Sequence, residues 1–153
     1  MKLVTFNLRC ESKCDGNNAF HHRRGFVIDR LETEKPDVIG FQEITPAMNE
    51  YLRTHLREYT LVGCGREADY QGEHNPVAFL SDKYELIGLD VSWLSDTPYA
   101  PGSRFEKQSL CPRIITHTIL RPIGEGKPFH VYNTHLDHAF DEARVLGAKR
   151  LLE

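Results

Sequence analysis

Apolar residues recur with two different spacings in the first part of this chain, and these spacings predict a strand, a helix and a second strand. The alternation in residues 3–7 predicts the first strand, and the run of apolar residues in 37–43 predicts the second. Between them, residues 22–35 carry apolar side chains at helical spacing, and Pro36 ends the helix. Its buried stripe is expected to be Phe26, Val27, Ile28 and Leu31.

The pattern then gives one more helix and changes to strands. A helix running to about residue 58 is predicted because Thr45 and Pro46 form an N-cap followed by proline at the first helical position. Its buried stripe is expected to be Tyr51, Leu52 and Leu56. Short segments rich in Val, Ile, Phe and Thr predict strands at residues 59–63, 75–81, 86–94, 113–120 and 129–134. Together these elements indicate an α+β domain with a mixed sheet.

Three further segments complete the pattern. Residues 10–20 are expected to form a polar loop, and the turn-rich residues 95–111 a surface excursion near a site. Residues 140–153 are predicted to form a last helix with Ala143, Leu146 and Leu151 on one side. Because no glycine, asparagine or proline closes this helix, we expect the sequence to end inside it.

Composition is that of one ordinary globular domain, which we assign to residues 1–153. The chain has 40% hydrophobic and 27% charged residues, and its net charge is -3. There is no general basic field, so attraction of a polyanion requires a local patch or a metal ion. This weakens the prediction of tight binding to duplex nucleic acid.

Membrane insertion and disulfide chemistry are not indicated. No apolar run approaches the roughly 20 residues that a membrane span needs, and the chain starts directly with a strand pattern. We therefore expect a cytoplasmic protein without a membrane span. The four cysteines contain no Cys-x-x-Cys pair, so free thiols are expected.

Polar residues stand where three predicted strands end. Asn7 ends the first strand, Glu43 ends the second, and His135 and Asp137 follow the last. In α/β sheets, sites are built at the edge where strands end and the chain turns toward solvent. The sequence therefore predicts a site assembled from separate strands.

Six segments in this order resemble the endonuclease/exonuclease/phosphatase superfamily, the deoxyribonuclease I-like fold of Mg²⁺-dependent phosphodiesterases and phosphomonoesterases. They are Thr5-Phe6-Asn7, Arg23-Arg24, the run from Pro36 to Glu43, the run from Trp93 to Pro98, Pro112-Arg113, and Asn133-Thr134-His135-Leu136-Asp137-His138. The resemblance implies the first half of a four-layer α/β sandwich, with a mixed, mostly antiparallel sheet and flanking helices.

The resemblance also implies roles for individual residues. Glu43 would be the ligand of Mg²⁺, with Mn²⁺ as a substitute, because these ions prefer oxygen ligands. Asn7 would position this glutamate and a phosphate oxygen through its amide, and His135 would contact the scissile phosphate. The alternatives are a solvated glutamate that caps the next helix, a turn-forming asparagine and a hydrogen-bonded structural histidine.

Three further residues are predicted with more open alternatives. Asp137 would orient His135, or it would cap the last helix. Arg113 resembles an arginine that binds the phosphate, although a surface salt bridge is nearly as well supported. Asn75 resembles a polar residue beside the site.

The second half of the superfamily's domain has no counterpart in this chain. Its Asp-x-Asn motif and its late Asp-His pair do not occur after residue 138. We therefore expect that the apolar face of the sheet lacks a partner, and that the missing half or a partner chain is needed to cover it.

The predicted function is Mg²⁺-dependent hydrolysis of phosphate esters. A phosphodiesterase or nuclease comes first, so nucleic acid is the first expected partner. The alternatives are a lipid, inositol or small-molecule phosphoesterase of the same fold, or an incomplete module that hydrolyses nothing.

Overall fold

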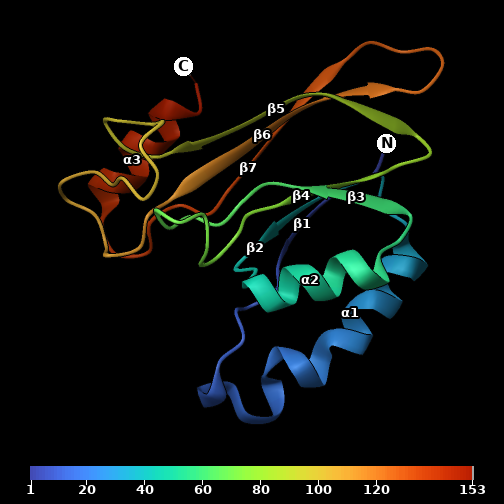
Figure 1. Ribbon diagram of the computed structural model, residues 1–153, viewed down its shortest axis with the longest axis horizontal. Coiled ribbons are helices and arrows are strands. Elements are labelled where there is room, and N and C mark those ends of the chain that lie inside the picture. Colours follow the sequence, from blue (N-terminus) through green and yellow to red (C-terminus); the bar gives the residue numbers. More distant parts are fainter. Residues whose placement is uncertain (153) are drawn as a thin grey trace.

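The computed structural model describes residues 1–152, and Figure 1 shows two sheets stacked on each other with a layer of helices on one side. The helices are α1 (Phe20–Glu34), α2 (Pro46–His55) and α3 (Asp141–Arg150). The strands are β1 (Leu3–Asn7), β2 (Val38–Gln42), β3 (Tyr59–Val62), β4 (Val77–Leu80), β5 (Tyr84–Trp93), β6 (Ile114–Pro122) and β7 (Phe129–Thr134). In Figure 1, α1 and α2 lie on one side of β1 to β4, and β5 to β7 lie on the other.

The strands form two sheets instead of the single mixed sheet that the sequence pattern suggests. The first has the order β1-β2-β4-β3, in which β1 and β2 are parallel and the other neighbours are antiparallel. The second, β5-β6-β7, is antiparallel throughout. The mixed and mostly antiparallel character is therefore confirmed. The parallel pair places Asn7 opposite Gln42, so that β1 and β2 end at the same edge.

The helix layer forms as the sequence predicts, with one exception. The side chain of Thr45 accepts a hydrogen bond from the backbone N–H of Met48, and Pro46 opens α2. On α1, however, Phe26 is 76% exposed, and Phe20 lies in the core instead. Phe20 shares one helical face with Val27, whereas Phe26 lies off that face, so its expected burial is wrong.

A second core lies between the two sheets. Val38, Val77 and Phe79 of the first sheet pack there against Leu120 of the second. Part of the apolar face of the first sheet is thus covered by strands of the same chain. That a missing half or a partner chain covers the rest stays a prediction. The cover does not extend over the outermost strand β1, where Leu3 stays 60% exposed.

Asn133 links the two sheets near the ends of the strands. Its side chain is buried, and its Nδ2 donates to the carbonyl oxygens of Phe41 at 2.7 Å and Asn75 at 3.0 Å. Its Oδ1 accepts from Gln42 Nε2 at 2.8 Å. A Cβ atom at Gly40 would lie 2.8 Å from this Oδ1, so glycine is required there. A satisfied buried network of this kind fixes one arrangement of the two sheets.

The remaining segments agree with the sequence in part. The expected polar loop before α1 contains a short 3-10 helix, Lys13–Asn18. All four cysteines are free, as expected. Within residues 1–152, no helix is both long and apolar enough to cross a membrane.

Candidate active site

The carboxyl ends of β1, β2 and β7 surround a pocket of about 320 Å³. The residues that line it are Arg9, Cys10, Glu43, Arg66, Glu73, Cys111, Arg113, His135 and His138. The structure thus brings Glu43, Arg113 and His135, which lie far apart in the sequence, to one place. Their catalytic and binding roles remain predictions.

Glu43 is held in the pocket by its backbone and by two hydrogen bonds. Its φ angle is 61°, a left-handed conformation that costs a non-glycine residue about 1–2 kcal/mol. Its carboxylate accepts from Asn7 Nδ2 at 2.8 Å and from the N–H of Cys10 at 3.0 Å. Burial raises the pKa of Glu43, but these hydrogen bonds together with nearby positive charges lower it below its ordinary value. The group is therefore a carboxylate at neutral pH.

Asn7 positions this carboxylate, as the resemblance implies. Its Nδ2 donates to Glu43, while its Oδ1 accepts from the backbone N–H of Arg9 at 2.8 Å. Arg9 also has a positive φ, 56°, and its guanidinium lies 4.0 Å from Glu43. The amide of Asn7 therefore connects the strand end, the following turn and the candidate metal ligand. A contact with phosphate remains a prediction.

His135 directly follows β7, and one nitrogen of its ring makes no hydrogen bond with the described residues. Its Nδ1 is buried and has no hydrogen-bond partner in the described part of the chain. Burial lowers the pKa of His135, and the charge of Arg113 lowers it further, while Glu43 and Glu73 oppose this. The ring is therefore neutral at pH 7 unless a bound anion raises its pKa.

Arg113 is the most deeply buried cation of the pocket, with 5% of its side chain exposed. Its Nη2 lies 2.9 Å from His138 Nδ1, and its Nε has no hydrogen-bond partner. The nearest acid is Asp137, whose Oδ2 is 3.7 Å from that Nε, too far for a hydrogen bond. The surface salt bridge considered from the sequence is thus replaced by a buried ion pair beside the pocket.

Asp137 and Asn75 lie behind the pocket and do not line it. Asp137 accepts hydrogen bonds from the N–H groups of Ala139 and Phe140, both at 2.9 Å, and from the hydroxyl of Ser109. Burial raises the pKa of Asp137, but these hydrogen bonds lower it to about 2. These contacts hold the turn before α3, whose N-cap residue is Phe140 and has no side-chain capping hydrogen bond, so Asp137 does not cap the helix. None of its hydrogen bonds joins it to His135.

Asn75 is buried too. Its side chain lies 3.5 Å from the carbonyl oxygen of Ile114, and its own carbonyl accepts from Asn133. These contacts place Asn75 between the two sheets. Its contact with substrate remains a prediction.

Sequence reasoning did not single out Arg66 and Glu73, which come from the segment between β3 and β4. Arg66 Nη1 donates to Glu73 Oε2 at 2.7 Å, and Arg66 Nε is buried without a hydrogen-bond partner. The available signal was the glycine-rich stretch around them, since Gly65 and Gly72 both occupy positions where a Cβ would collide with neighbouring atoms. Residues of the pocket wall on such a segment follow no periodic pattern.

The donor set fits a hard divalent cation. Each oxygen of Glu43 accepts one hydrogen bond and retains a further acceptor position. Among residues 1–152, no three His, Cys, Asp or Glu side chains are grouped as metal ligands. A carboxylate with a free acceptor position, such as that of Glu43, is a ligand of the kind that Mg²⁺ uses, because Mg²⁺ is typically held by one or two carboxylates together with substrate phosphate.

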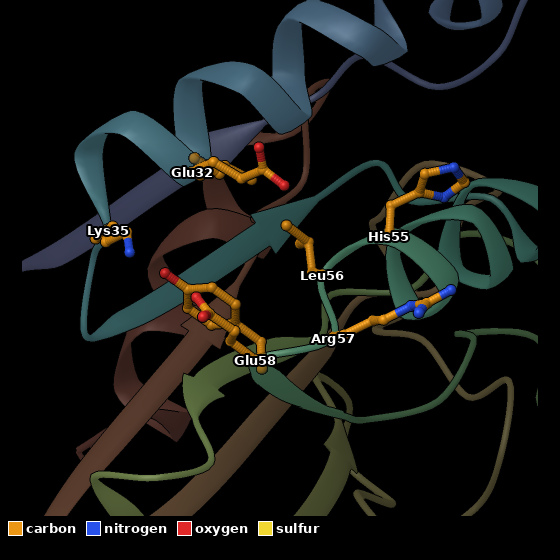
Figure 2. Close-up of a pocket in the computed structure, with 8 residues that line it drawn as sticks. Glu32, Lys35, His55, Leu56, Arg57 and Glu58 are labelled. Atoms are coloured by element: carbon orange, nitrogen blue, oxygen red, sulfur yellow. The ribbon is translucent and has the colours of Figure 1, made fainter.

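A larger hollow, of about 450 Å³, lies elsewhere, at the carboxyl ends of α1 and α2 (Figure 2). Figure 2 shows Glu32 and Lys35 on one side of it and His55 and Arg57 on the other. None of the buried atoms without a hydrogen-bond partner in residues 1–152 belongs to its lining. We therefore place the candidate active site in the smaller pocket.

Comparison with known proteins supports this fold. No family model matches the sequence. An endonuclease/exonuclease/phosphatase from Bacteroides vulgatus is 31% identical, with a TM-score of 0.95 over 99% of this chain and 58% of its own. A mannosyl-6-phosphatase from Bacteroides thetaiotaomicron is 26% identical, with a TM-score of 0.93 over 99% of this chain and 57% of its own.

A curated sequence, the uncharacterised protein L388 of Acanthamoeba polyphaga mimivirus, is 27% identical over 77% of this chain and 46% of its own length. The chain thus spans about half the length of the proteins that it matches. Over that span, it has the deoxyribonuclease I-like fold of the endonuclease/exonuclease/phosphatase superfamily.

Proposed function

We propose that the pocket at the ends of β1, β2 and β7 binds and hydrolyses a phosphate ester with the help of Mg²⁺ or Mn²⁺. The observation that carries this proposal is a pair of buried nitrogen atoms that have no hydrogen-bond partner among residues 1–152, Arg113 Nε and His135 Nδ1, on residues that line this pocket. Unpaired buried polar groups cost about 1–3 kcal/mol each. An anion that accepts from such groups compensates for this cost.

Each residue then has a defined task. Glu43 holds the metal ion, which when bound neutralises negative charge on the phosphate oxygens. Asn7 keeps the carboxylate of Glu43 in place through its 2.8 Å hydrogen bond. Arg113 donates to the phosphate oxygens that gain charge as the ester bond breaks.

His135 contributes a ring nitrogen to the same phosphate. In its neutral form it donates or accepts one hydrogen bond at Nδ1, according to its tautomer. A bound phosphate dianion raises the pKa of the imidazole, which prepares it to give a proton to the leaving oxygen. Burial lowers the pKa of His135, and the bound phosphate offsets this effect.

Two substrate classes remain, and the observations favour the second. A nuclease is first by the resemblance of the sequence. A small phosphorylated molecule is favoured by the net charge of -3 and by the similarity to a mannosyl-6-phosphatase. The pocket also argues against an incomplete module that hydrolyses nothing. A site without function is not expected to keep buried donors that lack hydrogen-bond partners.

Phosphate release measures this proposal directly. The purified protein is incubated with Mn²⁺ or Mg²⁺ and a panel of p-nitrophenyl phosphate, bis-p-nitrophenyl phosphate and hexose phosphates. We expect metal-dependent release that EDTA and the Glu43→Gln variant both abolish. Release that persists in the variant, or no release from any ester with either metal, contradicts the proposal.

A further inference from the structure

One wall of the pocket is an ion pair that the phosphate chemistry described above does not need. Arg66 and Glu73 come from the segment between β3 and β4, and their side chains meet at 2.7 Å. Both side chains are largely buried, with 13% and 23% of their surface exposed. A carboxylate in an anion-binding pocket is costly, so its position calls for a specific partner.

The segment that carries this pair is fixed on both sides. The indole Nε1 of Trp93 donates to the carbonyl oxygen of Arg66 at 2.6 Å. On the other side, His74 and Ile44 exchange two backbone hydrogen bonds, at 2.7 and 3.2 Å. Gly65 allows a tight return of the chain, since a Cβ there would lie 2.1 Å from the carbonyl oxygen of Gln71. The pair is therefore held in place before any ligand arrives.

The pair offers one acceptor and several donors to a ligand. Glu73 Oε2 is occupied by Arg66, whereas Glu73 Oε1 accepts no hydrogen bond from the described residues. The guanidinium of Arg66 keeps donor capacity, because its Nε makes no hydrogen bond with the described residues and lies 3.5 Å from Glu67 Oε1. A carbon chain with neighbouring hydroxyl groups matches this arrangement, because each hydroxyl both donates and accepts.

The carboxylate of this pair opposes a second phosphate on its side of the pocket. Glu73 lines the same pocket as Glu43, so a ligand there meets two carboxylates. A polynucleotide would bring a neighbouring phosphate close to this wall. Like charges at short range disfavour such a ligand, which is how a site rejects a wrong substrate.

We propose that Arg66 and Glu73 recognise the hydroxyl groups of the alcohol part of the substrate, and so select monophosphate esters of sugars and similar polyols over polynucleotides. The inference rests on the proposed function and specifies its substrate class. Glu73 provides the acceptor, Arg66 provides the donor, and the phosphate itself stays with Arg113 and His135.

Binding to the purified protein, measured by calorimetry in the presence of Mg²⁺, tests this. The probes are glucose 6-phosphate, ethyl phosphate, which lacks the hydroxyl groups, and the thymidine dinucleotide pTpT. We expect glucose 6-phosphate to bind at least about 100-fold more tightly than ethyl phosphate, since two hydrogen bonds to charged groups distinguish them. In Glu73→Gln this ratio should fall to near one, and pTpT should bind a few-fold more tightly.

A matched control is Glu67→Gln. Glu67 lies 3.5 Å from Arg66 Nε but is 45% exposed and does not line the pocket, so its removal should leave all three affinities unchanged. Should Glu73→Gln fail to fold, as judged by its thermal unfolding, Arg66→Lys replaces it, because lysine keeps the charge but loses the fork. The same loss of selectivity is expected.

The outcomes separate the two proposals. Absence of binding by all three probes contradicts the proposed function itself. Equal binding of ethyl phosphate and glucose 6-phosphate by the unmodified protein, or an equal effect of Glu67→Gln and Glu73→Gln, overturns only the selection by hydroxyl groups.

Discussion

The two hollows of this molecule differ in whether the buried polar atoms of their lining residues have hydrogen-bond partners. The hollow at the ends of α1 and α2 has the larger volume, about 450 Å³ against about 320 Å³, and charged side chains surround it (Figure 2). Among residues 1–152, no buried side-chain atom without a hydrogen-bond partner belongs to the lining of the larger hollow, whereas three such nitrogen atoms belong to residues of the smaller pocket. We therefore place the candidate site by its unsatisfied polar groups and not by its size.

The largest difference between the hollows should appear in metal binding. Replacing Glu43 by Gln removes the carboxylate that we assign to the cation, so the affinity for Mn²⁺ should fall at least about 100-fold. Glu58→Gln makes the same change in the wall of the larger hollow and should leave Mn²⁺ binding unchanged. Calorimetry or the paramagnetic effect of Mn²⁺ on water relaxation measures both. Equal affinities in the two variants would remove the distinction.

A second prediction concerns the stability of the wall of the smaller pocket. Asp137 lies behind Arg113, and its pKa of about 2 is below its ordinary value of 3.8. A depressed pKa stabilises the folded protein above about pH 4, and this contribution is lost as the pH falls toward 2.

Replacing Asp137 by Asn should therefore lower the free energy of unfolding by about 2 kcal/mol at pH 7. Urea unfolding at a series of pH values measures this. The difference between the two proteins should shrink between about pH 4 and pH 2. A constant difference over that range contradicts the assignment.

Anion binding should distinguish the arginines of the two hollows. Arg113→Lys keeps the charge but loses the planar fork, so the affinity for inorganic phosphate should fall about tenfold. Arg57→Lys, in the larger hollow, serves as the matched control and should have no effect. Phosphorus NMR titration reports on both. A similar loss in both variants would indicate nonspecific attraction.

The smallest expected effect is a change in titration. Addition of phosphate should raise the pKa of His135, because the bound anion opposes the burial and the Arg113 charge that lower it. The ring protons of this residue, followed by NMR across the pH range, measure the change. The ring signals of His55 in the larger hollow should not move when phosphate is added. An unchanged titration of His135 would argue against its contact with the anion.

Much of the chain was predictable because local patterns decide it. The cap of α2 at Thr45 needs only neighbouring residues, and so do the alternation in β1 and the buried stripe of α3. The site-forming ends of β1 and β2 were predictable for a related reason, since polar residues directly follow apolar strands. Phe26 shows the limit of this reasoning, because adjacent apolar residues cannot all face the core of one helix.

The parts that could not be predicted depend on contacts between distant segments. Nothing local distinguishes a strand of the first sheet from one of the second, so the two sheets were expected as one. Asn133 stood out in the sequence only as part of the run that resembles the superfamily, whereas its hydrogen bond across the sheets depends on a carbonyl of β2 within its reach. Arg66 and Glu73 line the pocket through a segment whose course is set by Trp93, far along the chain.

The cross-sheet amide of Asn133 has a consequence for any attempt to change this protein. Its Nδ2 donates to the carbonyl oxygen of Phe41, two residues before Glu43. A side chain at position 40 would collide with its Oδ1, so Gly40 leaves room for it. The contact between the two sheets and the shape of the candidate pocket are therefore set by the same few atoms. Random variation at Gly40 or Asn133 should lose folding and ligand binding together, so neither property can be tuned there alone.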